Sequence, residues 1–169
     1  MAERNRKRIH YLRWTLFIVY LFGLLYFTIF SESLGRTPGT AGSSTGMYNL
    51  EPFAEIRRFW TYREQLGAGA VILNLFGNIA AFIPCGYLLP RVMHRCSTLS
   101  STMLIGFLIT FVIESTQYLF SVGSFDVDDV LLNLLGVLIG YMLHLWVSRY
   151  ALKRQGKRSL KIREIRFRD

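Results

Sequence analysis

The stretch FDVDDVLLNLLGVLIGY, residues 125–141, decides the fold, because it places three aspartates directly before and at the start of an apolar segment. That segment then contains an asparagine, Asn133, near its beginning. A charged side chain at bilayer depth costs at least ~2.5 kcal/mol, so membrane proteins turn such groups toward the interior of a helix bundle, where they find partners. The stretch therefore predicts a membrane helix whose polar face packs against other helices.

Apolar stretches of suitable length occur four times in the 169-residue chain. They are 17, 19, 19 and 18 residues long, and a membrane-spanning helix needs about 17–25 residues. No charged residue interrupts the first stretch, whereas each helix of a soluble bundle keeps one polar face. The sequence predicts an all-α fold, a polytopic membrane helix bundle with four transmembrane helices. The predicted spans are 14–30, 71–89, 102–120 and 130–147.

The basic residues predict the orientation of the chain, whose formal net charge is +9. Of the 20 Lys and Arg residues, 16 lie in the N-terminus, the connection 91–101 or the C-terminal tail. These segments fall on one side of a four-span chain, and the positive-inside rule makes that side cytoplasmic. We expect a multi-pass protein of the cell membrane with a basic cytoplasmic N-terminus (1–13), a transmembrane domain (14–147) and a basic cytoplasmic tail (148–169). The first apolar stretch exceeds the usual length of a signal-peptide core, so we expect it to be retained.

The long connection 31–70 is expected on the outer side and divides in two. A Gly/Ser/Thr-rich connector comes first, and this composition has no means of forming a core. Phe53, Ile56 and Trp60 then recur at helical spacing, which predicts a short interfacial helix on the outer membrane surface. Two uses of this helix stay open: a lid over the mouth of the bundle, and a loop that grips a ligand.

Polar residues recur in the outer halves of three predicted spans. Residues three, four or seven apart share one face of a helix, so each span presents a stripe of amide or carboxyl groups. The candidate ligand-binding residues are Asn74 and Asn78 in the second span, Glu114 and Gln117 in the third, and Asp126, Asp129 and Asn133 at the fourth. Asp128 falls off this stripe, and we expect it to be solvated. Polar groups can simply hold membrane helices together, but two carboxylates with several amides on three helices exceed that need.

Glu114 is central to the predicted site, because no Lys or Arg occurs within any span to neutralise it. Its carboxyl group must be protonated, hydrogen-bonded to amides, open to outer water or bound to a cation. We expect Glu114 and Asp129 to share a hydrogen-bonded cluster with the amides of Asn78 and Asn133, beneath residues 53–60. Glu114 and Asp129 are also the candidate catalytic pair, an acid and a base, if the protein is an enzyme.

Small residues and a proline predict how the helices pack. Gly136 and Gly140 form a GxxxG motif, which lets a neighbouring helix approach closely. Gly77 and Gly86 are expected to allow the same close approach. Pro84 is expected to kink the second span and to free backbone carbonyl groups near the middle of the membrane.

Three motifs in this order are NLEPF (49–53), NLFGNIAAFIPCGYLL (74–89) and ESTQYLFSVGSFDVDDVLLNLLGVLIG (114–140). Together they resemble the VanZ-like family of bacterial membrane proteins, over nearly all of residues 49–141. The resemblance implies that the polar positions of the family fall on the seven candidate residues above. The family's namesake is associated with low-level resistance to the glycopeptide teicoplanin.

Two departures from the family pattern concern the site. Many members carry an arginine shortly before the first aspartate of the fourth-span motif, where this chain has Ser124. A cation that clamps an anionic headgroup is therefore not expected there. Cys85 stands where a large apolar residue is usual, and we expect it to be a small packing residue.

Three classes of function fit these residues. The leading one is a cell-envelope protein that binds a lipophilic or lipid-linked ligand, such as a cell-wall precursor or a lipoglycopeptide, in an outward-facing polar pocket and contributes to teicoplanin-type resistance. The second is a membrane enzyme that acts on a lipid or cell-wall precursor, but all three histidines fall on the predicted cytoplasmic side, away from the site. The third is a small proton-coupled transporter. Four spans would give it only a narrow pathway, and the sequence shows no inverted repeat of the kind that many transporters have.

The sequence also indicates which partners, metals and cofactors to expect. The basic tail has no recognisable nucleic-acid fold, and basic residues beside a membrane attract anionic lipid, so we expect a lipid bilayer and no nucleic acid as partner. The sequence contains no HExxH or CxxC motif, and no metal or cofactor is expected. Carboxylates and amides could nevertheless hold a divalent cation.

Overall fold

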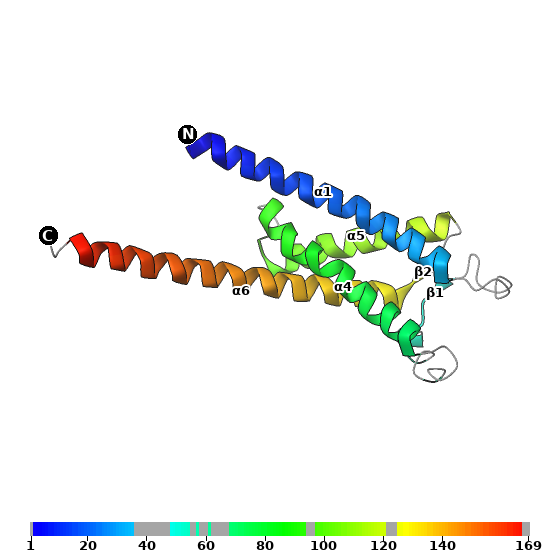
Figure 1. Cartoon of the computed structure of the whole chain (residues 1–169). Helices are drawn as coiled ribbons and strands as arrows, with labels where there is room; N and C mark the ends of the chain where they lie inside the picture. Colours follow the sequence, from blue (N-terminus) through cyan, green and yellow to red (C-terminus); the bar gives the residue numbers. More distant parts are fainter. Residues whose placement is uncertain are drawn as a thin grey trace.

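The computed structural model describes residues 2–35, 48–54, 57, 61, 68–93, 97–120 and 125–166. Within these residues, the elements in chain order are α1 (Ala2–Gly35), β1 (Tyr48–Asn49), α4 (Ala68–Val92), α5 (Leu99–Leu119), β2 (Phe125–Asp126) and α6 (Val127–Arg166) (Figure 1). Four helices are long and apolar enough to cross a membrane. The predicted bundle with four membrane helices is confirmed, and the chain is a multi-pass membrane protein.

The two short strands mark one end of the bundle, which we call the β end. They pair in parallel, with Tyr48 opposite Phe125 and Asn49 opposite Asp126. The N-terminus of α6 lies at the β end, whereas both chain termini lie at the opposite end (Figure 1). The sequence does not predict this strand pair, because two residues are too few to show the alternation that is typical of a strand.

Helix α6 is much longer than the predicted fourth span. Its 40 residues rise ~1.5 Å each, or roughly 60 Å in total, about twice the ~30 Å hydrocarbon core of a bilayer. The C-terminal half of α6 extends past the ends of α4 and α5 (Figure 1). The tail predicted to begin at residue 148 is therefore part of one continuous helix that runs to Arg166.

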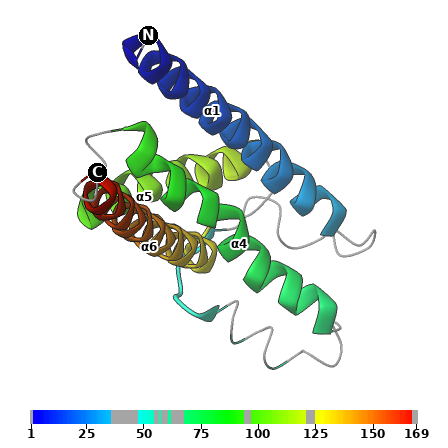
Figure 2. The same cartoon turned by 60° about the vertical axis from the view of Figure 1, so that its left-hand side comes forward.

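Very close packing joins α6 to α4, and the two helices cross in Figure 2. A Cβ atom added at Gly140 would meet the carbonyl oxygen of Ile83, and one added at Gly136 would meet that of Ile79, both far inside van der Waals contact. Only residues without a side chain let two helix backbones approach this closely. The packing role predicted for the GxxxG motif is confirmed.

The other two glycines behave differently from each other. A Cβ atom at Gly86 would meet the backbone of Val137, so its predicted role in close packing is confirmed. The prediction for Gly77 is wrong, because no atom of the described residues lies within 4 Å of the corresponding position. Gly77 comes two residues before Ile79, and a separation of two residues places it on the opposite side of α4 from the face that meets α6.

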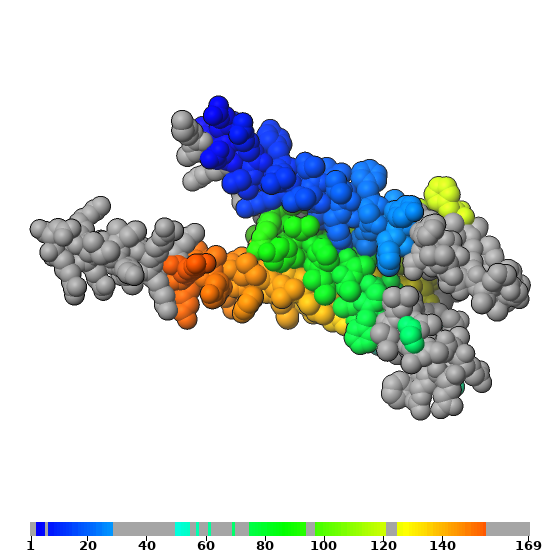
Figure 3. All heavy atoms as spheres, in the orientation of Figure 1, coloured from blue at the N-terminus to red at the C-terminus, as the bar shows by residue number. Residues whose placement is uncertain are grey.

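Helix α1 packs along α4, which lies between α1 and α6 on the face shown in Figure 3. Phe17 and Leu24 are 4% and 5% exposed and belong to the hydrophobic core. Between them, the hydroxyl of Tyr20 donates a hydrogen bond to the carbonyl oxygen of Ala81 at 2.7 Å. Ala81 lies in the turn before Pro84. Pro84 has no N–H to donate, but α4 remains helical through this proline.

Candidate functional site

The three aspartates at the start of α6 have different partners. Asp126 directly precedes the helix, and its Oδ1 atom accepts a hydrogen bond from the backbone N–H of Asp128 at 2.8 Å. This is an N-cap arrangement, which satisfies one of the N–H groups that the first turn leaves unpaired. The positive end of the helix dipole also favours the carboxylates of Asp128 and Asp129 in that turn. Asp126 is 3% exposed, so this candidate residue is part of the helix start itself.

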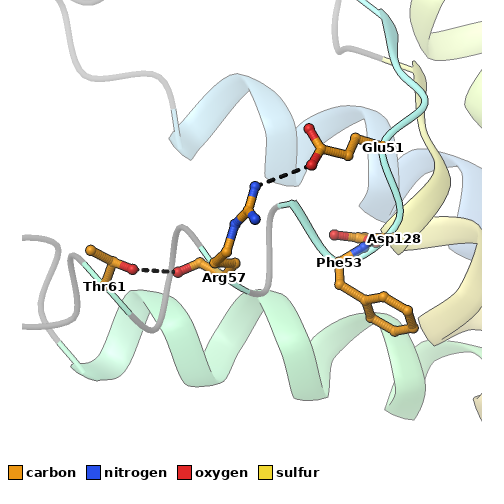
Figure 4. Close-up of polar contacts among 5 residues, drawn as sticks. All are labelled: Glu51, Phe53, Arg57, Thr61 and Asp128. Atoms are coloured by element: carbon orange, nitrogen blue, oxygen red, sulfur yellow. Dashed lines mark hydrogen bonds and ion pairs between the residues drawn. The ribbon is translucent and has the colours of Figure 1, made fainter.

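Asp128 corrects one expectation, because it is 1% exposed rather than solvated. Its Oδ1 atom accepts a hydrogen bond from the backbone N–H of Phe53 at 2.5 Å, and Figure 4 shows the two residues side by side. Phe53 has a positive φ of 65°, an uncommon conformation for a large side chain. Asp128 does lie off the stripe of Asp126 and Asp129, but its carboxylate meets the distant loop instead of water.

Segment 48–54 is therefore attached to the start of α6 at two points, the β1–β2 pair and the Phe53–Asp128 bond. Beside it, the guanidinium of Arg57 pairs with the carboxylate of Glu51 at 3.1 Å (Figure 4). Both side chains of this ion pair are exposed, so the pair contributes little to stability. Ile56 and Trp60 of the predicted interfacial helix lie outside the described residues.

Asp129 connects α6 to α4. The amide Nδ2 of Asn78 donates a hydrogen bond to Asp129 Oδ1 at 2.5 Å. The predicted contact between these two stripes is confirmed at this pair of residues. Asn74 lies one turn earlier in α4, and its side chain lies outside the described part of the structure.

The buried face of α5 is polar along most of its length. Its buried residues are Thr102, Gly106, Thr110, Ile113, Glu114 and Gln117. Most are separated by three or four residues, which puts them on one face of the helix. Glu114 is 4% exposed and Gln117 is 3% exposed, so both point into the bundle and away from lipid, as predicted.

Asn133 has a partner that the sequence did not predict. It is 2% exposed, and its Nδ2 atom donates to the hydroxyl oxygen of Thr110 at 2.7 Å. Within the described residues its amide thus bonds a hydroxyl group, whereas we expected a bond to a carboxylate. Thr110 lies four residues before Glu114, on the same face of α5, and this spacing is the signal that could have identified it. The larger cluster with Glu114 stays a prediction.

Gln117 connects α5 to α1, because its Nε2 atom donates to the carbonyl oxygen of Thr28 at 3.4 Å. Its Oε1 atom and the Oδ1 atom of Asn133 are buried and have no hydrogen-bond partner among the described residues. Buried polar atoms nearly always have a partner, and leaving one unpaired costs about 1–3 kcal/mol. The β end thus contains two acceptors that a donor from outside the described chain can satisfy.

Metal-binding geometry is not seen in the part of the chain that the structure describes, where no three His, Cys, Asp or Glu residues are placed to hold an ion. Cys85 is 0% exposed and belongs to the hydrophobic core, in agreement with its expected packing role. The described side chains at the β end offer carboxylate, amide and hydroxyl groups, which bind through hydrogen bonds.

A family model for VanZ/LLP1 matches residues 17–148, from the first membrane helix into the last. The chain belongs to the VanZ/LLP1 family. The match includes all seven candidate residues, and the predicted resemblance to VanZ-like proteins is confirmed. No curated protein and no solved structure matches the chain at a significant level.

The Asn78–Asp129 bond of this VanZ/LLP1 protein leads to a first prediction. Asn78→Ala and Asp129→Ala should each lower the free energy of unfolding. The double variant should lose less than the sum of the two, by about 0.6–1.7 kcal/mol, the range for hydrogen-bonded pairs between membrane helices. Equilibrium unfolding of the purified protein in detergent, arranged as a double-mutant cycle, measures this coupling.

A matched cycle provides the control. Thr116 donates its hydroxyl to the carbonyl oxygen of Val112 within its own helix, so Asn78→Ala combined with Thr116→Val should be additive. Additive losses for the Asn78 and Asp129 variants as well would contradict a bond between these two side chains.

Proposed function

We propose that this VanZ/LLP1 protein binds a lipophilic or lipid-linked ligand through polar side chains at the β end, and that it contributes to resistance against teicoplanin-type glycopeptides. The observation that carries the proposal is the burial of a carboxyl group and two amides, those of Glu114, Gln117 and Asn133, inside the membrane bundle. Ionisable residues within membrane helices are rare because they are costly to bury, and they commonly mark a pathway or binding site.

The chemistry of the β end supports a ligand with both polar and apolar parts. The unpaired Oε1 atom of Gln117 and Oδ1 atom of Asn133 are acceptors, which favour hydroxyl or N–H groups on the ligand. At the end of α5, Leu119 and Phe120 are 76% and 74% exposed. An acyl chain can lie against such apolar side chains while its headgroup reaches the polar residues.

Segment 48–54 offers a way to control access. It is attached to the start of α6 by the β1–β2 pair and by the Phe53–Asp128 bond, and Glu114, Gln117 and Asn133 are buried. We therefore favour the lid over the alternative of a gripping loop. In this proposal the lid moves before a ligand headgroup reaches Glu114.

The proposal places the β end on the outer side of the cell membrane. The termini, 1–13 and 148–169, then lie in the cytoplasm, because most of the Lys and Arg residues flank the membrane on that side and basic segments are retained inside. An outward-facing site is accessible to glycopeptides and to precursors that have crossed the membrane.

Cysteine labelling checks this orientation. In a variant lacking Cys85 and Cys96, we expect Ser43→Cys to react with a membrane-impermeant maleimide in intact cells. Ser159→Cys should react only after the cells are permeabilised, since it lies in the predicted cytoplasmic tail. The reverse pattern would contradict the orientation, and the outward-facing site with it.

Growth of a teicoplanin-susceptible Gram-positive host tests the function. Cells that express the protein should tolerate a higher teicoplanin concentration than cells with an empty vector. Gln117→Leu should reduce this tolerance, because it removes a buried acceptor, and Thr116→Val on the same helix should preserve it. Susceptibility equal to that of the vector control, with the protein present in the membrane by immunoblot, would refute the proposal.

A further inference from the structure

A second polar cluster lies at the end of the bundle opposite the β end. Arg13 of α1, Arg91 of α4 and His144 of α6 lie toward this end, and like-charge repulsion couples Arg91 to each of the other two. Arg13 directly precedes the first predicted span, and Arg91 follows the second by two residues. The cluster therefore lies at the depth where hydrocarbon gives way to lipid headgroups.

The guanidinium of Arg91 is held in a defined position. Its Cζ atom lies 3.7 Å from the centroid of the Tyr87 ring, and its Nη1 atom donates to the Tyr87 carbonyl oxygen at 3.1 Å. A guanidinium has five N–H donors, and this bond uses one of them. The planar group thus rests on an aromatic face, with donors left for another ligand.

Aromatic rings also fix the third member of the cluster. The imidazole of His144 packs edge-on against Tyr87, with ring centroids 6.4 Å apart, and lies 6.2 Å from the ring of Tyr141. The hydroxyl of Tyr141 donates to the carbonyl oxygen of Ser97 at 3.1 Å, which ties this part of α6 to the start of α5. The positions of Arg91 and His144 are therefore built into the packing of α4, α5 and α6.

The charges of the cluster are unbalanced. Neither Arg13 nor Arg91 forms an ion pair with another residue that the structure describes. Arg13 and Arg91 repel each other, and repulsion between like charges is strongest where water is scarce. An anion between them relieves the repulsion, and a phosphate oxygen matches the planar N–H donors of arginine.

We propose that Arg13 and Arg91 bind the phosphate of an anionic glycerophospholipid, with Tyr87 as the platform that orients Arg91. The depth of the cluster favours a membrane lipid over free phosphate, because its acyl chains can lie against the apolar surfaces of α1 and α4 while the phosphate stays at their ends. This site is separate from the one at the β end and does not depend on the proposed resistance function.

Native mass spectrometry of the purified full chain tests the site by titration with phosphatidylglycerol or phosphatidylcholine. The wild type should retain phosphatidylglycerol more tightly. Arg91→Gln should weaken phosphatidylglycerol binding roughly fivefold, the effect of one lost basic charge near a membrane surface, while binding of phosphatidylcholine stays the same. Equal binding of the two lipids to the wild type would overturn the proposal.

Three further measurements complete the test. Lys153→Gln, an exposed residue of α6, should leave lipid binding unchanged, and a loss equal to that of Arg91→Gln would reduce the site to general charge attraction. Arg13→Gln changes an exposed side chain and should repeat the loss even if Arg91→Gln does not fold. Full competition by inorganic phosphate would show an anion site without lipid specificity and contradict the lipid assignment.

Discussion

Gly140→Leu is expected to remove most of the folded protein from the membrane. The added Cβ atom would lie 2.8 Å from the backbone nitrogen of Tyr87 and 3.0 Å from the Cα atom of Gly86, in addition to its clash with the Ile83 carbonyl. Backbone atoms cannot move aside as a flexible side chain does, so the cost should reach or exceed the upper end of the ~1–3 kcal/mol that overpacking usually carries. Size-exclusion chromatography and thermal unfolding in detergent measure the yield and stability.

Gly77→Leu is the matched control for this prediction. It makes the same change in α4, at a position where no atom of the described chain lies within 4 Å of the added Cβ, and leucine is a better helix former than glycine. Its yield should equal that of the wild type. If both variants accumulate equally, the close crossing of α4 and α6 does not describe the protein in the membrane.

Glu114→Gln is expected to abolish teicoplanin tolerance in expressing cells while the protein stays folded. Glutamine keeps the size and shape of the side chain, but it replaces one carboxyl oxygen by an NH2 donor and removes the ability to carry a negative charge or to exchange a proton. Glu114 is 4% exposed, so a neutral amide should cost the buried interior no stability. Inhibitory teicoplanin concentrations, immunoblots of the membrane fraction and thermal unfolding are measured on the same variants.

Thr116→Val is the control that distinguishes a functional site at Glu114 from a general sensitivity of α5 to substitution. Thr116 lies two residues from Glu114, and among the described residues its hydroxyl bonds only the backbone of its own helix, so tolerance should persist. A stable Glu114→Gln protein with full tolerance would assign Glu114 to helix packing. A variant that loses its fold and its function together would support the same assignment, and Gln117→Leu would then decide whether a separable site exists.

The sequence predicted the membrane helices and the main helix crossing, because both depend on local patterns. Hydropathy and the GxxxG spacing are set by neighbouring residues, and the four membrane helices and the close approach at Gly136 and Gly140 agree with the structure. The Asn78–Asp129 bond followed from the same reasoning, since residues on inward-facing stripes at similar depth have few polar partners to choose from.

The findings for Asp128 and Asn133 concern partners that periodicity does not specify, whereas the Gly77 correction follows from its position two residues from Ile79. Helical spacing showed that Asp128 leaves the stripe, but it could not show that Phe53 would bring a backbone N–H to that face. Likewise, the Glu114 carboxyl group and the Thr110 hydroxyl lie on the same face of α5. Which of them is level with Asn133 depends on how far α5 is shifted along its axis relative to α6, and helical spacing does not give that shift. Whether the seven candidate residues bind a ligand remains a prediction that the Glu114 and Gln117 variants test.

The attachment of Phe53 to Asp128 also sets an order of events during synthesis. The two residues are 75 positions apart, and at 5–20 residues per second a ribosome needs roughly 4–15 s to make that length of chain. During this interval segment 48–54 has neither β2 nor the start of α6 to hold it, and Asn78 has been made without its aspartate partner. The contacts of the β end therefore form only after the start of α6 has been made, and a chain truncated before Phe125 would leave Asn78 of α4 without its carboxylate partner.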